Sequence, residues 1–168
     1  MADPFAVAGS AVGVISLGLT VCQGLINYCE AWRSQSEEVE SFVQRLEALS
    51  NTLEILQDRT EKLGSAHTLT ARNVVKCIND CSSGIKQLEE FLQKYKQAAS
   101  VLAAGSLPDK LKARSRMALY PFQRKTLESL DNILGGLEYN LSLANQALHT
   151  FVTNPYEFHR QMLTVTHQ

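Results

Sequence analysis

The stretch PFAVAGSAVGVISLGLTVCQGLINYC, residues 4–29, contains no charged side chain and is followed by Glu30 and Arg33. Four of the chain's nine glycines lie in it. Glycine in a helix interior costs roughly 1 kcal/mol relative to alanine, so a helix here is weak in isolation. The stretch therefore predicts an N-terminal helix, over about residues 4–33, that depends on a partner surface of protein or lipid.

Small residues recur along this helix at spacings of three and four: Gly9, Gly13, Ser16, Thr20 and Gly24. This spacing places them on one face of a helix. A smooth face of this kind lets another backbone approach closely, as small-xxx-small motifs do in membrane helices. We expect this packing stripe to face the rest of the protein at rest.

The larger apolar residues of the same helix are candidates for membrane insertion. They are Phe5, Val7, Val12, Val14, Ile15, Leu17, Leu19, Val21, Leu25 and Ile26. About 20 apolar residues suffice to cross a bilayer, and each strong one contributes roughly −0.3 to −0.6 kcal/mol to insertion. The polar residues and glycines offset much of that sum, so insertion is conditional. The alternative is that this helix is the first helix of a soluble bundle. The two interpretations are compatible if the protein switches between a packed and a membrane-inserted state.

The N-terminus does not have the pattern of a targeting signal. Its first basic residue is Arg33, whereas secretory signals and mitochondrial presequences carry basic residues before or within the apolar part. Position 2 is Ala2 rather than the glycine that myristoylation requires. We expect the protein to be cytoplasmic at rest.

Three further apolar stripes follow, each with helical spacing. The first is Val39, Phe42, Leu46, Leu49, Leu53, Leu56, Thr60 and Leu63; the second is Val74, Ile78, Cys81, Ile85, Leu88, Leu92, Tyr95, Ala99 and Leu102; the third is Leu127, Leu130, Leu134, Leu137, Leu141, Ala144, Leu148 and Phe151. Ser34 and Glu37 have the spacing of a capping box before the first stripe. The second stripe predicts one helix of some 30 residues.

These patterns predict an all-α protein: a bundle of four main helices, with a short basic helix between Asp109 and Tyr120, before Pro121. The bundle would occupy residues 1–151, and residues 152–168 would form a tail or the start of a linker. An extended coiled coil is the competing architecture. Gly64, Pro108 and Pro121 interrupt the chain at intervals that favour the bundle.

Basic residues gather late in the chain, with Asp109 as their only acidic neighbour between residues 108 and 125. They are Lys110, Lys112, Arg114, Arg116, Arg124 and Lys125. Such a cluster is a candidate site for anionic lipid headgroups. A solvated helix face, or a partner for the acidic helix, is the alternative. The overall charge of −1, and the lack of aromatic residues interleaved with the cluster, argue against nucleic acid.

Sequence motifs for catalysis, cofactors and metals are missing. No phosphate-binding loop occurs, and the early glycines do not follow a strand as a dinucleotide fingerprint requires. Cys22, Cys29, Cys77 and Cys81 form no CxxC pair and have no histidine at ligand spacing. We therefore expect buried, reduced cysteines, no cofactor, no metal and no enzymatic activity.

Five segments of the chain form a recognisable set: Met1 to Phe5, Val7 to Leu19, Val21 to Leu25, Tyr120 to Leu127 and Asn140 to Ala144. They resemble the N-terminal, HeLo-like domain of fungal STAND proteins, and the resemblance covers roughly residues 1–150. It implies a helical bundle related to the HeLo cell-death domain and to the four-helix executioner domain of the mixed-lineage kinase-like pseudokinase. In that group, assembly of several copies releases the N-terminal helix, which then permeabilises membrane.

The resemblance leads us to expect a cell-death effector domain of a fungal NLR/STAND-type immune receptor. Its partners would be anionic lipids of the plasma membrane, other copies of itself, and an upstream nucleotide-binding module or an amyloid-type signal. The packing stripe would then contact sister helices after release. The alternative is a non-lytic adaptor bundle that signals by self-association or by docking another helical domain.

Overall fold

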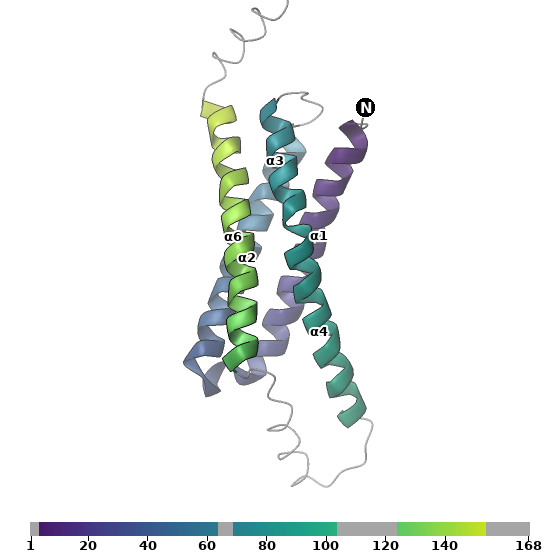
Figure 1. Ribbon diagram of the computed structural model, residues 1–168, viewed down its shortest axis with the longest axis vertical. Helices are drawn as coiled ribbons and strands as arrows, with labels where there is room; N and C mark the ends of the chain where they lie inside the picture. Colours follow the sequence, from purple (N-terminus) through teal and green to yellow (C-terminus); the bar gives the residue numbers. More distant parts are fainter. Residues whose placement is uncertain (1–3, 64–68, 104–123, 154–168) are drawn as a thin grey trace, which may run out of the picture.

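The computed structural model describes residues 4–63, 69–103 and 124–153, and this part of the chain is an all-α bundle. Its elements are α1 (Pro4–Cys29), the 3-10 helix η1 (Glu30–Gln35), α2 (Glu37–Leu63), α3 (Leu69–Asp80), α4 (Ser82–Ala103) and α6 (Arg124–Thr153). α3 and α4 follow one another as two arms of a bent rod, so the bundle has four columns (Figure 1). The predicted four-helix bundle is confirmed. The predicted basic helix between Asp109 and Tyr120 lies outside the described residues, as do residues 154–168 of the tail.

The heptad stripes form the core, as predicted. Almost every stripe residue whose side chain is described is buried: Val39, Phe42, Leu46, Leu49, Leu53 and Leu56 in α2; Val74, Ile78, Cys81, Ile85, Leu88 and Leu92 in the α3–α4 column; and Leu127, Leu130, Leu134, Leu137, Leu141, Ala144 and Leu148 in α6. Thr60 and Tyr95 are half-buried. Among the described side chains no polar or charged residue is buried. Apolar burial therefore dominates the packing of the bundle.

The prediction of a single helix over the second stripe is wrong, because the helix is interrupted at Cys81. The Cys81 amide bonds the Ile78 carbonyl at 3.1 Å, three residues back rather than four. Ser82, Ser83 and Gly84 follow, and Gly/Ser pairs are a common cause of helix kinks. A Cβ on Gly84 would lie 2.9 Å from Leu137 Cδ2, so this glycine also lets α4 start close against α6.

The turn between α1 and α2 also differs from the expectation. The predicted capping box of Ser34 and Glu37 is wrong: the residue before α2 is Ser36, which has extended backbone angles, and its carbonyl accepts the Glu40 amide at 3.0 Å. Glu37, Glu38 and Glu40 occupy the first turn of α2, where carboxylates offset the positive end of the helix dipole. Arg33 of η1 reaches Glu47 of α2 at 3.3 Å and ties the turn to α2.

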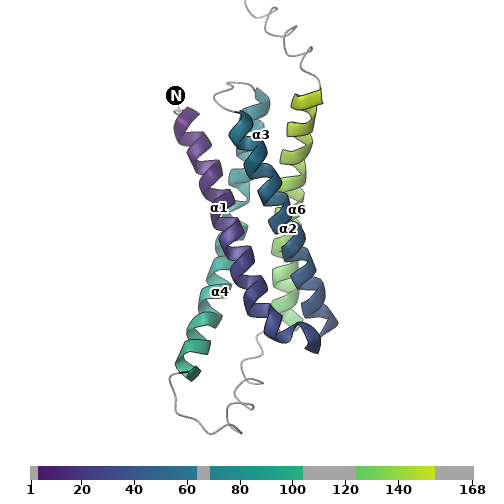
Figure 2. The same cartoon turned by 180° about the vertical axis from the view of Figure 1, so that it is seen from behind.

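α1 and α6 stand at opposite corners of the bundle. α1 packs against α2, α3 and α4, and α6 packs against the same three helices. Both views show α2 and α3 between them (Figures 1 and 2). Beyond the kink, α4 diverges from α6 and crosses α1, which it contacts (Figures 1 and 2). Each corner helix therefore has an inward side against the bundle and an outward side turned away from it.

Candidate functional site

The inward side of α1 is deeply packed. Its buried residues are Ala11, Ile15, Gly18, Val21, Cys22, Leu25 and Cys29. Ile15, Leu25 and Cys29 have no exposed surface. At the end of the helix, Tyr28 meets Tyr95 of α4 with ring centroids 6.2 Å apart, and Tyr95 in turn stacks obliquely on Phe91 at 4.5 Å. Burial raises the pKa of Tyr28 to about 12.

Two glycines bring α1 close to its neighbours. A Cβ on Gly18 would lie 2.8 Å from Leu53 Cδ1 of α2 and 3.1 Å from Ile85 Cδ1 of α4. A Cβ on Gly24 would lie 2.5 Å from Leu92 Cδ2 of α4. The lack of side chains at these two positions therefore lets the bulky leucine and isoleucine side chains of α2 and α4 reach the α1 backbone.

The predicted packing stripe, by contrast, does not face the bundle. Gly13, Ser16 and Thr20 are exposed, and a Cβ on Gly13 would have no atom within 4 Å. The expectation that these three pack inward at rest is wrong, because the bulkier Ile15 and Leu25 turn the opposite side of α1 to the core. Gly24, at the edge of the stripe, does make a close contact. The side chains of residues 4–10 lie outside the described part of the structure, so Gly9 is not placed.

The candidate membrane-inserting residues lie on several sides of α1. Ile15, Val21 and Leu25 are buried, while Val14, Leu17, Leu19 and Ile26 are half-buried. Val12 is exposed at 36%. Phe5 and Val7 lie among the undescribed side chains. The outward side of α1 is completed by Gly13, Ser16, Thr20, Gln23 and Asn27, none of which is charged.

Two polar side chains on the outward side of α1 donate hydrogen bonds within the helix. The Thr20 hydroxyl donates to the Ser16 carbonyl at 2.9 Å, and the Gln23 amide donates to Asn27 Oδ1 at 3.0 Å. Internal bonds of this kind lower the cost of removing such groups from water, because the donors keep a partner. The outward side of α1 is therefore suited to burial against a further surface.

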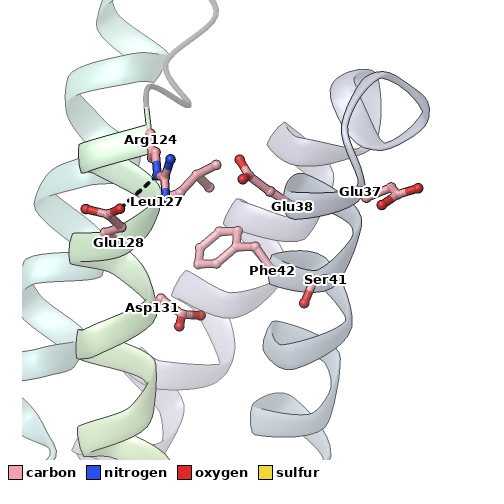
Figure 3. Close-up of a pocket in the computed structure, with 8 residues that line it drawn as sticks. All are labelled: Glu37, Glu38, Ser41, Phe42, Arg124, Leu127, Glu128 and Asp131. Atoms are coloured by element: carbon pink, nitrogen blue, oxygen red, sulfur yellow. Dashed lines mark hydrogen bonds and ion pairs between the residues drawn. The ribbon is translucent and has the colours of Figure 1, made fainter.

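The predicted lipid-binding cluster is only partly within the described residues. Arg124 and Lys125 are exposed at the start of α6, whereas Lys110, Lys112, Arg114 and Arg116 lie outside the described part. Arg124 bonds Glu128 at 3.1 Å. It shares an open groove of about 560 Å³ with Glu37, Glu38, Ser41, Phe42, Leu127, Glu128 and Asp131 (Figure 3). Four carboxylates around one guanidinium weaken its attraction for an anionic headgroup.

A polar clamp between α2 and α6 has no counterpart in the sequence patterns above. Arg45 donates to both carboxylate oxygens of Glu138, at 3.0 and 2.9 Å, and also to Asp131. Arg59 donates to Asn145 Oδ1 at 2.6 Å. The sequence carries no local signal for this clamp, because its partners lie 86 or 93 residues apart in the chain. These hydrogen bonds join α2 to α6, on the side of the bundle that α1 does not contact.

The cysteines have the environment of small core residues, and all four are free. Burial raises the pKa of the Cys22, Cys29 and Cys81 thiols to about 12. The Cys81 thiol donates to the Cys77 carbonyl at 3.3 Å. Within the described residues, no group of three His, Cys, Asp or Glu side chains is placed to hold a metal ion.

The model of a family described as "Pigment biosynthesis cluster protein PigL N-terminal" matches residues 2–107, more than half of the chain. The chain belongs to this family. It is also similar to the azaphilone pigments biosynthesis cluster protein L of Monascus ruber, with 26% identity over 151 residues. That match covers 90% of this chain and 32% of the relative, so the chain spans about a third of the length of the curated relative it matches. No solved structure matches the chain.

Both matches fit a fungal, helical protein. Neither of them names a HeLo-like or STAND domain, so that finer resemblance stays a prediction. Their printed names refer to a pigment biosynthesis cluster and state no reaction.

Proposed function

We propose that this chain is a non-enzymatic effector domain that permeabilises membrane by inserting α1 when several copies assemble. The supporting observation is the stretch Ala11–Cys29, which has a mean hydropathy of 1.5 although only 33% of its residues are fully buried. A core helix of a soluble protein that is this apolar is normally covered by its neighbours. The other described residues of α1 are half-buried or exposed and carry no charge, whereas α2 and α4 expose charged residues such as Glu54 and Lys86.

Internal hydrogen bonding supports the same proposal. In hydrocarbon every unsatisfied polar group is costly, and a helix that satisfies its own side chains reduces that cost. Thr20 and Gln23 already donate within α1. The conditional insertion expected from the sequence is therefore favoured by the conformation that α1 has in the bundle.

Release of α1 has a substantial cost, which explains why assembly is part of the proposal. Withdrawal would expose Ile15, Val21 and Leu25 together with the surfaces they cover. Burial of a side chain of this size is worth about 1.5–3 kcal/mol, so the three alone account for roughly 5–9 kcal/mol. That is comparable to the whole stability of a small domain. Insertion into hydrocarbon would bury the apolar side chains of α1 again, but not the bundle surfaces that α1 had covered. A single copy therefore keeps α1 docked.

The test uses Gly13→Glu, with Gly13→Ala as the matched control. Neither new side chain meets a bundle atom within 4 Å of its Cβ, so both variants should fold as the parent does. A carboxylate near the middle of a bilayer costs several kcal/mol. We expect at least a tenfold lower rate of dye release from anionic liposomes for Gly13→Glu, when the chains are clustered on the liposomes through a nickel-chelating lipid. Gly13→Ala should release dye as the parent does.

Circular dichroism and thermal unfolding check that both Gly13 variants keep the bundle. Equal dye release by the two variants would contradict insertion of α1, and so would the absence of release by the clustered parent. Deletion of residues 1–29 is a poorer test, because it removes Ile15 and Leu25 from the core and would unfold the bundle that it is meant to probe.

The proposal includes the basic cluster as a lipid-recruiting element. Arg124 lies among carboxylates, so recruitment would depend on the residues from Lys110 to Arg116. Charge reversal at Lys112 and Arg116 should weaken binding to anionic vesicles and leave binding to neutral vesicles unchanged. The protein would then be cytoplasmic at rest and move to the plasma membrane on activation. The match covers 32% of the Monascus ruber relative, and the proposal assigns the gathering of copies to modules outside this chain.

The second candidate is a non-lytic adaptor that docks another helix on the outward side of α1. One observation favours it: Gly13, Ser16 and Thr20 leave a shallow, uncharged surface without any release of α1. Under this reading the clustered chain binds its partner and releases no dye. The liposome experiment therefore separates the two candidates directly.

A further inference from the structure

The junction of α1 with η1 carries aromatic and charged residues that the preceding part of the helix lacks. Residues 6–27 contain neither kind, whereas Tyr28, Glu30, Trp32 and Arg33 follow directly. The backbone changes at the same place, because α1 ends at position 29 and the 3-10 helix η1 begins. Composition and backbone conformation therefore change together over residues 28–33, which we call the α1 boundary segment.

The stretch before the α1 boundary segment has the length of the hydrocarbon core of a bilayer. As a helix, residues 6–27 extend about 33 Å at 1.5 Å per residue, and the hydrocarbon core is about 30 Å thick. Phe5 precedes this stretch and Tyr28 follows it, so an aromatic residue stands at each end. Amphipathic aromatic rings are enriched at membrane–water interfaces, where they lie at the level of the headgroups. The middle of the stretch falls at Ser16.

The two aromatic rings of the α1 boundary segment are only half-buried in the bundle. Tyr28 meets Tyr95 of α4 with ring centroids 6.2 Å apart, and Trp32 packs against the edge of the core. Each ring therefore has one side against protein and another side near water. A membrane–water interface offers the same division between an apolar and a wet side. These rings lose less on leaving the bundle than Ile15 and Leu25, which have no exposed surface.

The charged residues tie the α1 boundary segment to α2. Arg33 Nη1 lies 3.6 Å from Glu30 Oε2 and 3.3 Å from Glu47 Oε1 of α2. Since Glu47 belongs to α2, this tie does not depend on the position of α1. Arginine near the end of a membrane helix keeps its charged head at the interface while its stem stays in apolar surroundings. The charges therefore mark the point where the chain stops being suited to hydrocarbon.

The outward side of α1 distinguishes two orientations in a membrane. A helix that lies in the plane of the interface has a strongly charged polar face that meets the headgroups. The outward side of α1 carries Gly13, Ser16, Thr20, Gln23 and Asn27, and none of them is charged. This side is therefore suited to a helix that crosses the bilayer rather than to one that lies flat on it.

We propose that inserted α1 crosses the bilayer over residues 6–27 and stops with the α1 boundary segment at the interface on the side of the bundle. The rings of Tyr28 and Trp32 lie at the level of the headgroups, and Arg33 lies among the headgroups and stays close to α2. This inference rests on the proposed function for the insertion itself. It deepens that function, because it states how far α1 enters the lipid and which residues end its entry.

The first test measures the depth of the α1 boundary segment with a probe that the chain already contains. Trp32 is its only tryptophan, so its fluorescence needs no substitution. The whole chain is clustered on anionic liposomes through a nickel-chelating lipid, and the acyl chains carry bromine either near the headgroup or near the chain end. We expect the shallow bromine to quench Trp32 about twofold more strongly than the deep one, because the ring lies at the interface.

A second probe tests the orientation of α1. Ser16→Trp in a Trp32→Phe background moves the single tryptophan to the middle of the crossing stretch. Ser16 is exposed, so the bundle should accept the larger side chain there. The deep bromine should now quench more strongly than the shallow one. Shallow quenching at both positions would show that α1 lies flat and would overturn the inference.

A matched pair of lysine variants tests the boundary through dye release. Ser16 and Asn27 are both exposed on the outward side of α1, so Ser16→Lys and Asn27→Lys add the same charge without entering the core. A lysine next to the interface reaches the headgroups, whereas one at the middle of the bilayer does not. We expect dye release about tenfold slower for Ser16→Lys and within about twofold of the parent for Asn27→Lys.

Thermal unfolding followed by circular dichroism checks that both lysine variants keep the bundle. Equal loss of dye release in the two variants would place Asn27 inside the hydrocarbon and overturn the boundary at Tyr28.

The fluorescence and dye-release results separate this inference from the proposed function. Dye release by the parent with Trp32 quenched mainly by the deep bromine would overturn the boundary and leave insertion of α1 standing. Shallow quenching of Trp32 and deep quenching of the Ser16→Trp probe without dye release would contradict permeabilisation and leave the boundary standing. Quenching of Trp32 by neither bromine in the clustered parent would overturn the inference.

Discussion

Both sides of α1 carry glycines and no charged residue, yet the surroundings of these glycines differ sharply. On the inward side Gly18 and Gly24 are overlain by leucine and isoleucine side chains, whereas on the outward side Gly13 has no neighbour within 4 Å. Large residues such as Ile15 and Leu25 determine which side faces the core, because they gain most from burial. A glycine in this helix therefore indicates close packing only when its side of the helix faces the bundle.

The largest expected effect separates the two sides by truncation. Leu25→Ala removes a side chain with no exposed surface and should lower the free energy of unfolding by about 2–5 kcal/mol, through lost burial and a cavity between α1 and its neighbours. Val12→Ala, on the outward side, should change it by less than about 0.5 kcal/mol. Urea unfolding followed by circular dichroism measures both values. Similar losses for the two variants would contradict the assignment of the sides.

A second test uses the thiols on the inward side of α1. Burial raises the pKa of Cys22 and Cys29 from 9.0 to about 12, so the folded state retains these protons at a pH where the unfolded chain has lost them. The unfolded state then binds fewer protons than the folded state, and stability falls as pH rises above about 9. Each thiol should contribute a loss approaching 1.4 kcal/mol per pH unit between about 9 and 12.

The measurement for the thiols is urea unfolding at a series of pH values from 8 to 11 under reducing conditions. The parent should lose stability more steeply than a variant carrying Cys22→Ala and Cys29→Ala, although the variant starts from a lower value. Cys81 and Tyr28, whose pKa values are raised in the same way, keep a residual slope in both proteins. Parallel slopes for the two proteins would show that the inward side of α1 is accessible to solvent.

The sequence predicts the amphipathic helices well and α1 poorly, for a physical reason. In α2 and α6 charged residues separate the apolar ones, so the side that faces the core can be read directly from the pattern. α1 has no charge to indicate an outward side, and its small and bulky stripes are each plausible contact surfaces. The choice depends on the shapes of Leu53, Ile85 and Leu92, which lie on other helices.

The break at Cys81 escaped prediction for a different reason. Ile78, Cys81 and Ile85 keep a spacing of three and four through the kink. The apolar spacing therefore continues across the point where the helix is interrupted. Ser82, Ser83 and Gly84 are the local signal for the break. The close contact that requires a glycine at position 84 is made by Leu137 on α6, which the local sequence does not reveal. The polar clamp of Arg45 with Glu138 likewise joins residues far apart in the sequence, which periodicity alone cannot pair.

The smallest and most specific effect compares two single-methyl changes within α1. Gly13→Ala adds a methyl group in open space and should raise the free energy of unfolding by about 1 kcal/mol, because alanine favours the helix and restricts the unfolded chain. Gly18→Ala gains the same helix preference, but its methyl group would lie 2.8 Å from Leu53 Cδ1 and 3.1 Å from Ile85 Cδ1. Overpacking of this kind costs about 1–3 kcal/mol, so Gly18→Ala should be neutral or destabilising. Thermal and urea unfolding of the two variants give the comparison, and an equal gain for both would show that α1 does not pack closely against α2 and α4.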